Sequence, residues 1–241
     1  MNWQKIKNST DNTHFLYEGK LVFNKRFLEI LKFHSPGIAP VRDESGAYHI
    51  NVSGEAVYAE RYARTFGFYC GRAAAAGKDG WFHIDENGKR IYPENYAWVG
   101  NYQENVCAVR DFDGRYFHID SDGNNIYGDK HLYCGDFKDG FACVKRQNGL
   151  FKHIDRNGRF INSEEFLGLG VFHKNFATAK DNDGWFHIGI NGKQIYERRF
   201  ANIEPFYNGQ AKVELFDGSL EIIDETGKTV LRISAPPIIS P

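Results

Sequence analysis

The sequence predicts an all-β fold, a β-propeller built from four-stranded antiparallel blades. Three observations predict it. One motif recurs along the chain with a period of 34 or 35 residues, which is typical of repeat architectures. Asn-Gly and Asp-Gly pairs, which favour tight hairpins, recur between short apolar segments. The 241 residues include 20 Phe and 13 Tyr but only 7 Pro, a composition typical of strands.

A histidine marks the period of the repeat. The string DGWFHIDENGKRIY at residues 79–92 returns as DGWFHIGINGKQIY at 183–196, and related strings precede, separate and follow these two. Five copies carry the histidine at spacings of 34, 35, 35 and 34 residues: His49, His83, His118, His153 and His187. Ile222 occupies the next position in the series. The duplicated string is therefore a building block of a repeat, and its residues need a structural explanation before a catalytic one.

Each repeat contains four short segments that we name strands A, B, C and D. Strands A and B occupy residues 27–41, 62–75, 96–109, 131–144, 166–179 and 200–213. Strand C carries the histidine, and strand D follows it. Turns such as Asp79-Gly80 join B to C, and turns such as Asn87-Gly88 join C to D, because these residue pairs tolerate the positive φ of a tight hairpin. The repeat is predicted to be an antiparallel meander.

The two ends of the chain complement each other. Residues 19–27 align with residues 88–96, so the N-terminus supplies strands B, C and D, with strand B predicted at residues 3–7. The last segment, APPIISP at 235–241, falls in the register of strand A. Residues 1–241 therefore predict one domain of seven blades, closed between the N- and C-termini. The prolines of 235–241 suit only an edge strand or a linker to another domain, so an open β-hairpin solenoid is the alternative.

Composition limits the classes of function. With 30 basic and 31 acidic residues the net charge is −1, which argues against nucleic-acid and anionic-membrane partners. No stretch approaches the roughly 18 apolar residues of a membrane-spanning helix, and no signal peptide is visible. The four cysteines lack Cys-x-x-Cys spacing, so neither a metal site nor a disulfide framework is expected. We expect a cytoplasmic protein without a cofactor.

The repeated histidines suggest catalytic or metal chemistry that the predicted geometry rejects. In a propeller, equivalent positions on strand C of neighbouring blades lie about 15 Å apart. A zinc ion needs its ligand nitrogens at about 2.1 Å, so these histidines cannot share one metal. We expect each histidine to be buried and hydrogen-bonded, and the Asp two residues later to set the C–D turn. The aromatic residues at the start of strand C (Trp81, Tyr116, Phe151 and Trp185) are expected to pack between blades.

The units resemble bacterial WG repeats, also called KWG repeats. The resemblance rests on Ile84-Asp85-Glu86-Asn87-Gly88-Lys89 at a turn and on Phe206-x-x-Gly209-x-Ala211-x-Val213. It covers nearly the whole chain, although Trp81 and Trp185 are followed by Phe rather than by the Gly that gives the repeat its name. The resemblance implies a binding or interaction module, in some cases attached to other domains. It supplies no catalytic residue.

Positions that vary between the repeats are candidates for function. The fourth residue of strand A is always apolar or small, whereas the third varies freely. The third residues are Glu29, Arg64, Trp98, Tyr133, Gly168 and Asn202. Because strand A is expected to be the innermost strand, this variable ring should approach the central channel. We therefore predict that Glu29, Arg64, Trp98, Tyr133 and Asn202 contact a ligand or partner.

The sequence predicts a non-catalytic binding or scaffolding module for a protein partner or for another domain of a longer chain. A polar small molecule or a glycan is also possible as a ligand. Two alternatives remain open. One is a lectin-like carbohydrate binder that uses exposed aromatic residues. The other is a propeller-type hydrolase that uses Glu29, Glu204 and Asp136, which requires two carboxylates about 5–9.5 Å apart.

Overall fold

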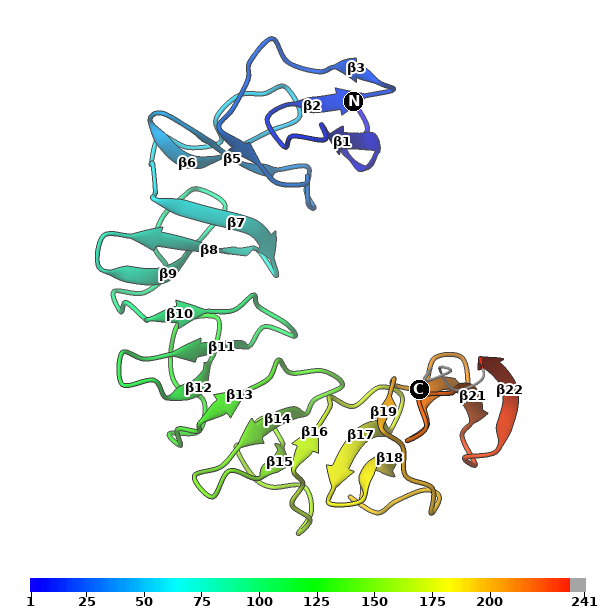
Figure 1. Cartoon of the computed structure of the whole chain (residues 1–241). Coiled ribbons are helices and arrows are strands. Elements are labelled where there is room, and N and C mark those ends of the chain that lie inside the picture. The colour runs from blue at the N-terminus through cyan, green and yellow to red at the C-terminus, as the bar shows by residue number, and fades with distance from the viewer. Residues whose placement is uncertain (235–241) are drawn as a thin grey trace, which may run out of the picture. The chain divides into compact units, whose positions relative to one another are not determined.

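Short antiparallel strands make up the computed structural model, which describes residues 1–234 (Figure 1). A one-turn 3-10 helix, η1 (Trp3–Lys5), precedes the first strand. The described strands form seven sheets. They are β1 (Ile6–Asn8), β2 (Phe15–Tyr17) and β3 (Lys20–Leu21); β4 (Glu29–Ile30), β5 (Ala39–Asp43) and β6 (Gly46–Ile50); β7 (Arg64–Tyr69), β8 (Arg72–Gly77) and β9 (Gly80–Ile84); β10 (Trp98–Val99), β11 (Cys107–Arg110) and β12 (Tyr116–Ile119); β13 (Tyr133–Cys134), β14 (Ala142–Lys145) and β15 (Phe151–Ile154); β16 (Gly168–Leu169), β17 (Phe176–Asp181) and β18 (Gly184–Gly189); and β19 (Asn202–Ile203), β20 (Gln210–Glu214), β21 (Leu220–Asp224) and β22 (Thr229–Ser234).

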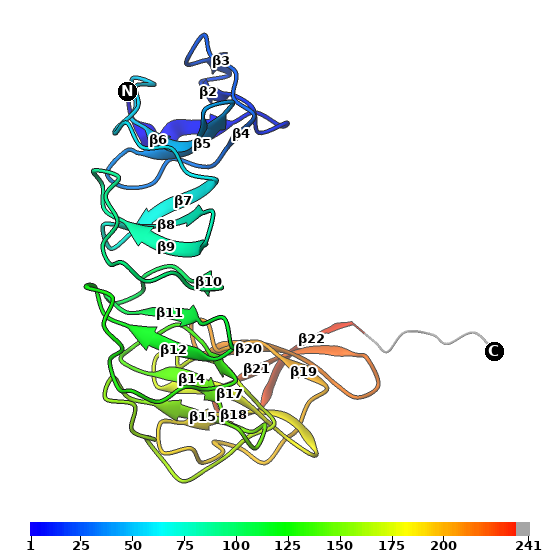
Figure 2. The same ribbon diagram turned by 90° about the vertical axis from the view of Figure 1, so that its left-hand side faces the viewer.

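The all-β class, the antiparallel meanders and the seven-part repeat are confirmed. The predicted pairing of 235–241 lies outside the described residues, so closure between the termini stays a prediction. The chain divides into two compact units, which we call unit 1 (1–114 and 118–125) and unit 2 (115–117 and 126–241). Within unit 1 the sheets β4–β6 and β7–β9 follow one another along the unit, as Figures 1 and 2 show. Whether 1–241 is one domain stays a prediction.

Strand D differs in detail from the prediction. It is a continuous strand, β22, in the seventh sheet, and a two-residue strand, β3, in the first. In the third sheet, by contrast, strand D pairs with strand C only at two bridges, Trp81 with Tyr96 and Ile84 with Arg90. The residues between the bridges leave the ladder because Tyr92 turns inward to a buried position beside His83. The seventh sheet has Ile222 in place of the histidine, and there the fourth strand pairs along its length, with two register shifts.

The N-terminal strand B also begins later than the sequence predicted. Residues 3–5 form the 3-10 helix, and pairing with β2 starts at Ile6. The helix begins at the Asn2 cap, whose side chain accepts a hydrogen bond from the Gln4 amide at 3.1 Å. This local cap competes with an extended conformation for the same residues.

The predicted role of the aspartates at the C–D turns is confirmed. Asp85 Oδ1 accepts the backbone N–H groups of Asn87 and Lys89 at 2.9 and 2.8 Å. Asp120, Asp155 and Asp224 make the same pair of bonds in their own turns. These bonds hold the reversal in which Gly88 adopts a φ of 76°.

Two glycines explain why the string DGW occurs twice. Gly80 and Gly184 have φ values of 127° and 135°, which L-residues with side chains rarely adopt. A Cβ at Gly80 would lie 2.7 Å from the Tyr96 carbonyl oxygen, and one at Gly184 would lie 2.6 Å from the Phe200 carbonyl oxygen. At both positions the backbone of strand D lies so close to the B–C turn that a residue with a side chain would clash with it.

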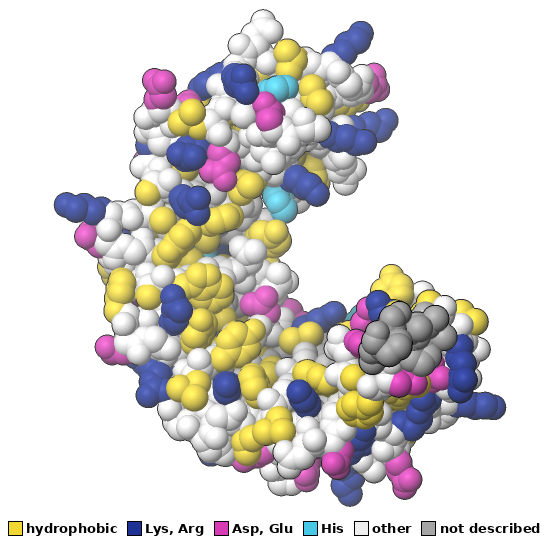
Figure 3. Space-filling model, viewed as in Figure 1, with side chains coloured by type: hydrophobic (Ala, Val, Ile, Leu, Met, Phe, Trp, Pro, Cys, Tyr) yellow, Lys and Arg dark blue, Asp and Glu magenta, His cyan; other side chains and the backbone are white. Residues whose placement is uncertain are grey.

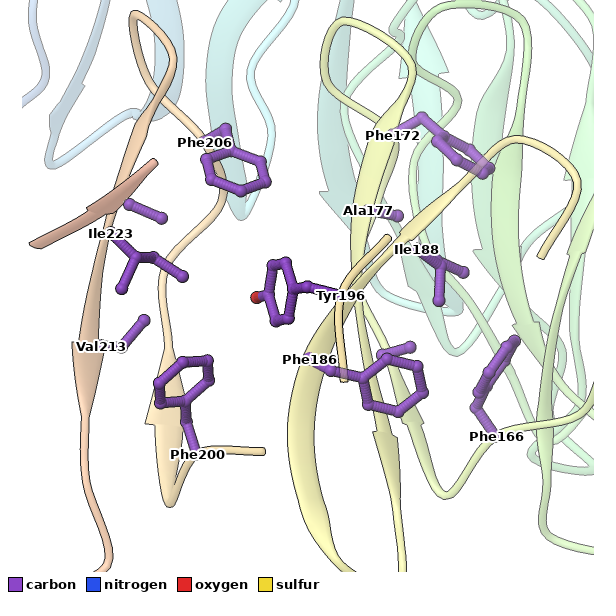
Figure 4. Packing of buried hydrophobic residues seen from close by; sticks show 12 residues of the cluster. Phe166, Phe172, Ala177, Phe186, Ile188, Tyr196, Phe200, Phe206, Val213 and Ile223 are labelled. Carbon is purple, nitrogen blue, oxygen red and sulfur yellow. The ribbon is translucent and has the colours of Figure 1, made fainter. Parts of the chain in front are cut away.

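The core lies within and between the sheets. The isoleucine that follows the repeated histidine is fully buried throughout, and Ile223 takes the corresponding place in the seventh sheet: Ile50, Ile84, Ile119, Ile154, Ile188 and Ile223. In unit 2, Phe172, Phe206 and Ile188 join the buried cluster shown in Figure 4. Small residues on strand B, such as Ala177 and Ala179, let adjacent sheets approach closely.

Candidate functional site

The repeated histidine joins strand C of one sheet to strand A of the next. His83 is fully buried, and its Nε2 lies 2.9 Å from the Gly100 carbonyl oxygen, which can only accept. The neutral ring therefore carries its proton on Nε2, and Nδ1 accepts the hydroxyl of Tyr92 at 2.6 Å. His187 has the same partners in its own repeat, Glu204 O at 3.0 Å and the Tyr196 hydroxyl at 2.5 Å. Both ring nitrogens are thus used by the fold.

The buried histidines are held in the neutral form. Burial lowers the pKa of His49, His83, His153 and His187 from 6.5 to about 4. A neutral, doubly hydrogen-bonded imidazole is poorly placed to move protons or to bind a metal ion. Residues 1–234 contain no group of three or more His, Cys, Asp or Glu side chains arranged to hold a metal. The expectation of a buried, structural histidine is confirmed.

One repeat lacks part of this arrangement. His153 Nε2 lies 2.7 Å from the Gly170 carbonyl oxygen, but its buried Nδ1 has no hydrogen-bond partner among the described residues. The tyrosine that lies nine residues after His83 and His187 is replaced here by Asn162. Asn162 instead accepts the Glu164 amide at 3.1 Å. The fifth sheet therefore carries a buried acceptor, whereas the Nδ1 atoms of His49, His83 and His187 each accept a tyrosine hydroxyl.

The aromatic residues of strand C pack differently from the prediction. Trp81 lies 5.8 Å from Phe66, a residue of strand A in its own sheet. In unit 2, Phe151 lies 6.5 Å from Tyr133, again within one sheet. Trp185 covers Gly168, where a Cβ would come within 2.8 Å of the indole. Packing between sheets is seen for Tyr116, whose ring lies 5.7 Å from Tyr133.

The variable residues of strand A occupy one register. Each pairs across the ladder with a strand B residue, for example Glu29 with Arg42, Arg64 with Ala76, and Trp98 with Arg110. The partners of Tyr133, Gly168 and Asn202 are Lys145, Lys180 and Glu214. The next residue of strand A is buried in the second to fifth sheets, as at Val99 and Cys134, and half-buried in the last two. Four of the six strand B partners are basic, so cationic groups line the positions beside the variable residues.

These residues are exposed to different extents. Trp98 and Tyr133 keep 38% and 45% of their surface accessible, and Arg64 and Asn202 are also exposed. Figure 3 shows hydrophobic side chains beside Lys and Arg side chains over strands β7–β11. Glu29 is half-buried and its Oε2 lies 3.3 Å from Arg42 Nε. Trp98 and Tyr133 therefore keep part of their surface accessible to solvent, whereas the Glu29 carboxylate is ion-paired with Arg42.

The structure brings only some of the predicted site residues together. In unit 1, Glu29 and Arg64 line one pocket of about 60 Å³ with Arg42 and Phe66. In unit 2, Asn202 lines a separate pocket of about 150 Å³ with Glu204, Lys212 and Glu214. Tyr133 lines neither pocket. Of the five residues, only Glu29 and Arg64 share one of these two pockets.

Two of the three carboxylates considered for hydrolysis are ion-paired with basic side chains. Glu204 Oε1 lies 2.6 Å from Lys212 Nζ, and Glu29 is paired with Arg42. Desolvation raises the pKa of Asp136, which is the direction expected for a general acid. Glu29 lies in unit 1 and the other two lie in unit 2. No described contact joins any two of these three carboxylates, so the structure offers no support for the two-carboxylate arrangement.

Sequence reasoning missed a larger hollow in unit 1. It has a volume of about 510 Å³ and lies along the strand A edges of consecutive sheets. Its wall includes His34, Phe66, Tyr69 and Asn101. A signal was present in the sequence, because Phe66 stands where the equivalent positions of three later repeats have glycine, namely Gly100, Gly135 and Gly170.

Comparisons with known proteins support the fold and nothing finer. No protein-family model matches the sequence, and no curated protein sequence matches it. Among solved structures, the computationally designed Ika8 protein matches with a TM-score of 0.56 and 12% identity over 95% of this chain and 83% of that one. BamB from Moraxella catarrhalis matches with a TM-score of 0.53 and 13% identity over 98% and 87%. A eukaryotic initiation factor matches with a TM-score of 0.63 and 11% identity over 96% and 73%.

These neighbours are β-propeller proteins, and at such low identity they show the fold alone. No helix within residues 1–234 is long and apolar enough to cross a membrane. The resemblance to WG repeats stays a prediction. The chain has a β-propeller-type fold of seven described antiparallel sheets.

Proposed function

We propose that this chain is a non-catalytic binding or scaffolding module of the WG-repeat type that engages a protein partner, or another domain of a longer chain. The exposed aromatic residues at the third position of strand A carry the proposal. A scaffold residue such as Ile84 is fully buried, whereas Trp98 and Tyr133 expose more than a third of their surface at a register that the repeat leaves free. Trp, Tyr and Arg are the residue types that dominate binding hot spots.

The surroundings of Tyr133 indicate the chemistry of the partner. Leu132 and Leu167, on the strand A segments of neighbouring sheets, are 38% and 47% exposed. Lys145 lies opposite Tyr133 in the ladder, and its Nζ is 5.3 Å from the centre of the Phe151 ring. An apolar segment flanked by acidic residues would bury the leucines and the Tyr133 ring while its charges pair with the lysine. We expect such a partner in the cytoplasm, and neither nucleic acid nor a membrane.

The test compares partner capture by the intact chain and by Trp98→Ala and Tyr133→Ala variants in lysate of the native host. Tyr207→Ala is the control, because Tyr207 is 73% exposed on a turn outside this register. For a captured protein, at least one of the two variants should weaken the measured affinity about thirtyfold, equivalent to about 2 kcal/mol. Their free energies of unfolding should change by about 1 kcal/mol or less.

Two results would count against this function. One is a partner that binds both variants as tightly as the intact chain. The other is a Trp98→Ala variant that loses about 3–5 kcal/mol of stability, the cost of a cavity at a packed aromatic residue.

A further inference from the structure

We propose that the hollow of unit 1 is a binding site for a neutral saccharide. The hollow has a volume of about 510 Å³, within the range of small-molecule sites. Its lining comes from the strand A segments of three consecutive sheets, β4, β7 and the residues after β10, and from residues beside β1. It does not include Trp98 or Tyr133, so this site is independent of the partner-binding residues proposed above.

The aromatic wall of the hollow departs from the repeat. Strand A is two residues long in the other sheets that contain it, but β7 continues for six residues with a register shift between Thr65 and Phe68. This extension adds the rings of Phe66 and Tyr69 to the lining. Phe66 rests on Trp81 at 5.8 Å and keeps 37% of its surface exposed. The Trp81 ring therefore holds the Phe66 ring in place at the wall of the hollow.

A glycine allows a third ring to join this wall. The His34 ring lies against Gly67, where a Cβ would be only 2.6 Å from His34 Cδ2. His34 also lies 5.2 Å from the Tyr69 ring, with a tilt of 55° between the two planes. Because Gly67 has no side chain, the His34 and Tyr69 rings can lie against each other at an angle in the lining of the hollow. Such a corner can receive the apolar C–H face of a sugar ring.

The remaining lining supplies hydrogen-bonding groups rather than net charge. Asn8 and Asn12 are already bonded to each other, with Asn8 Nδ2 donating to Asn12 Oδ1 at 3.1 Å. Within the described chain, the side chains of Asn101, Tyr69 and Lys32 make no hydrogen bond to protein, so their donors and acceptors are open to a ligand.

Glu29 and Lys32 are the acid and the base of the lining, and their formal charges cancel. Glu29 is also paired with Arg42 at 3.3 Å. An electrically balanced hollow with amide groups and an aromatic corner suits a neutral polyhydroxylated ring better than a phosphate or a carboxylate.

The experiment is a titration of the isotope-labelled full chain with neutral saccharides, followed by proton–nitrogen correlation spectra. The probes are glucose, galactose, mannose, N-acetylglucosamine and their 1,4-linked disaccharides. At least one should shift the backbone signal of Gly67 and the side-chain amide of Asn101. Phe66→Gly, which restores the residue of the later repeats, and Asn101→Ala should each weaken that saccharide about tenfold.

Two further variants separate the possible outcomes. Tyr133→Ala should bind the saccharide normally, because Tyr133 does not line this hollow. Lys32→Gln should change the affinity by no more than about twofold, since a neutral ligand does not depend on that charge. The assignment is overturned if none of the neutral saccharides shifts these signals, or if Phe66→Gly and Asn101→Ala bind as tightly as the intact chain. Glucuronate and adenosine are titrated for comparison, and the assignment is also overturned if only one of these two binds, or if Lys32→Gln abolishes binding.

Discussion

Replacing Tyr92 with Phe tests whether the histidine and tyrosine of each repeat act as one structural unit. The substitution removes one hydroxyl and leaves the ring. The ring should stay in place, because it packs beneath Gly123 of the next C–D turn, where a Cβ would clash with it. What changes is the partner of His83 Nδ1, which accepts the Tyr92 hydroxyl at 2.6 Å in a fully buried position.

The expected loss follows from the cost of a buried acceptor without a partner, about 1–3 kcal/mol. For a chain of this size, about 1 kcal/mol corresponds to a shift of roughly 2–4 °C in the melting temperature. The Tyr92→Phe variant should therefore melt about 2–12 °C lower than the intact chain. Tyr207→Phe is the control, since Tyr207 is 73% exposed and its hydroxyl can bond to water.

The assay should follow hydrogen exchange as well as melting, because hydrogen exchange reports local opening that one melting temperature does not resolve. Protection should fall first at the amides of β9 and of strand A in the next sheet, which His83 joins. A variant as stable as the Tyr207→Phe control, with unchanged protection at β9, would refute the idea that the tyrosine hydroxyl stabilises the histidine.

Three further predictions follow from the same structure. Asn162→Tyr should supply a hydroxyl donor for His153 Nδ1 and raise the free energy of unfolding in urea by about 1 kcal/mol, even though the hydrogen bond between Asn162 and the Glu164 amide is lost. A clear loss of stability would contradict this prediction. Acidification should destabilise the fold as the pH falls from 6.5 to about 4. In this range the histidines of the unfolded chain become protonated while the buried rings stay neutral, so each histidine lowers the free energy of unfolding by about 3 kcal/mol. Stability that stays flat across this pH range would argue against neutral buried rings. Gly184→Ala should lower the free energy of unfolding by more than about 2 kcal/mol, because residue 184 has a φ of 135° and its new Cβ would lie 2.6 Å from the Phe200 carbonyl oxygen. Gly149→Ala should lower it by less, because a Cβ at residue 149 would meet open space.

The sequence predicted the repeat well because its period is carried by residues that the fold cannot change. Gly80, Asp85 and the buried isoleucines recur for reasons that are visible in one repeat alone. Strand D was predicted less well, because its course depends on Tyr92 turning inward to His83. The recurrence of tyrosine nine residues after His49, His83, His118 and His187 was the signal that could have revealed this pairing.

The candidate site was predictable only in part. Trp98 and Tyr133 were singled out because their position varies between the repeats, and both are partly exposed in the structure. Which residues share a pocket did not follow, because that depends on contacts between sheets. The hollow beside Gly67 depends on the loop that carries His34, whose position no local pattern specifies.

The repeated histidines are neutral structural links, and we propose that function lies in the variable strand A residues. Nuclear magnetic resonance of the imidazole nitrogens across a pH titration tests the state of the histidines. The rings of His49, His83, His153 and His187 should carry the proton on Nε2 and should not titrate above about pH 5, consistent with pKa values of about 4. Rings that titrate near pH 6.5, or that carry the proton on Nδ1, would contradict it.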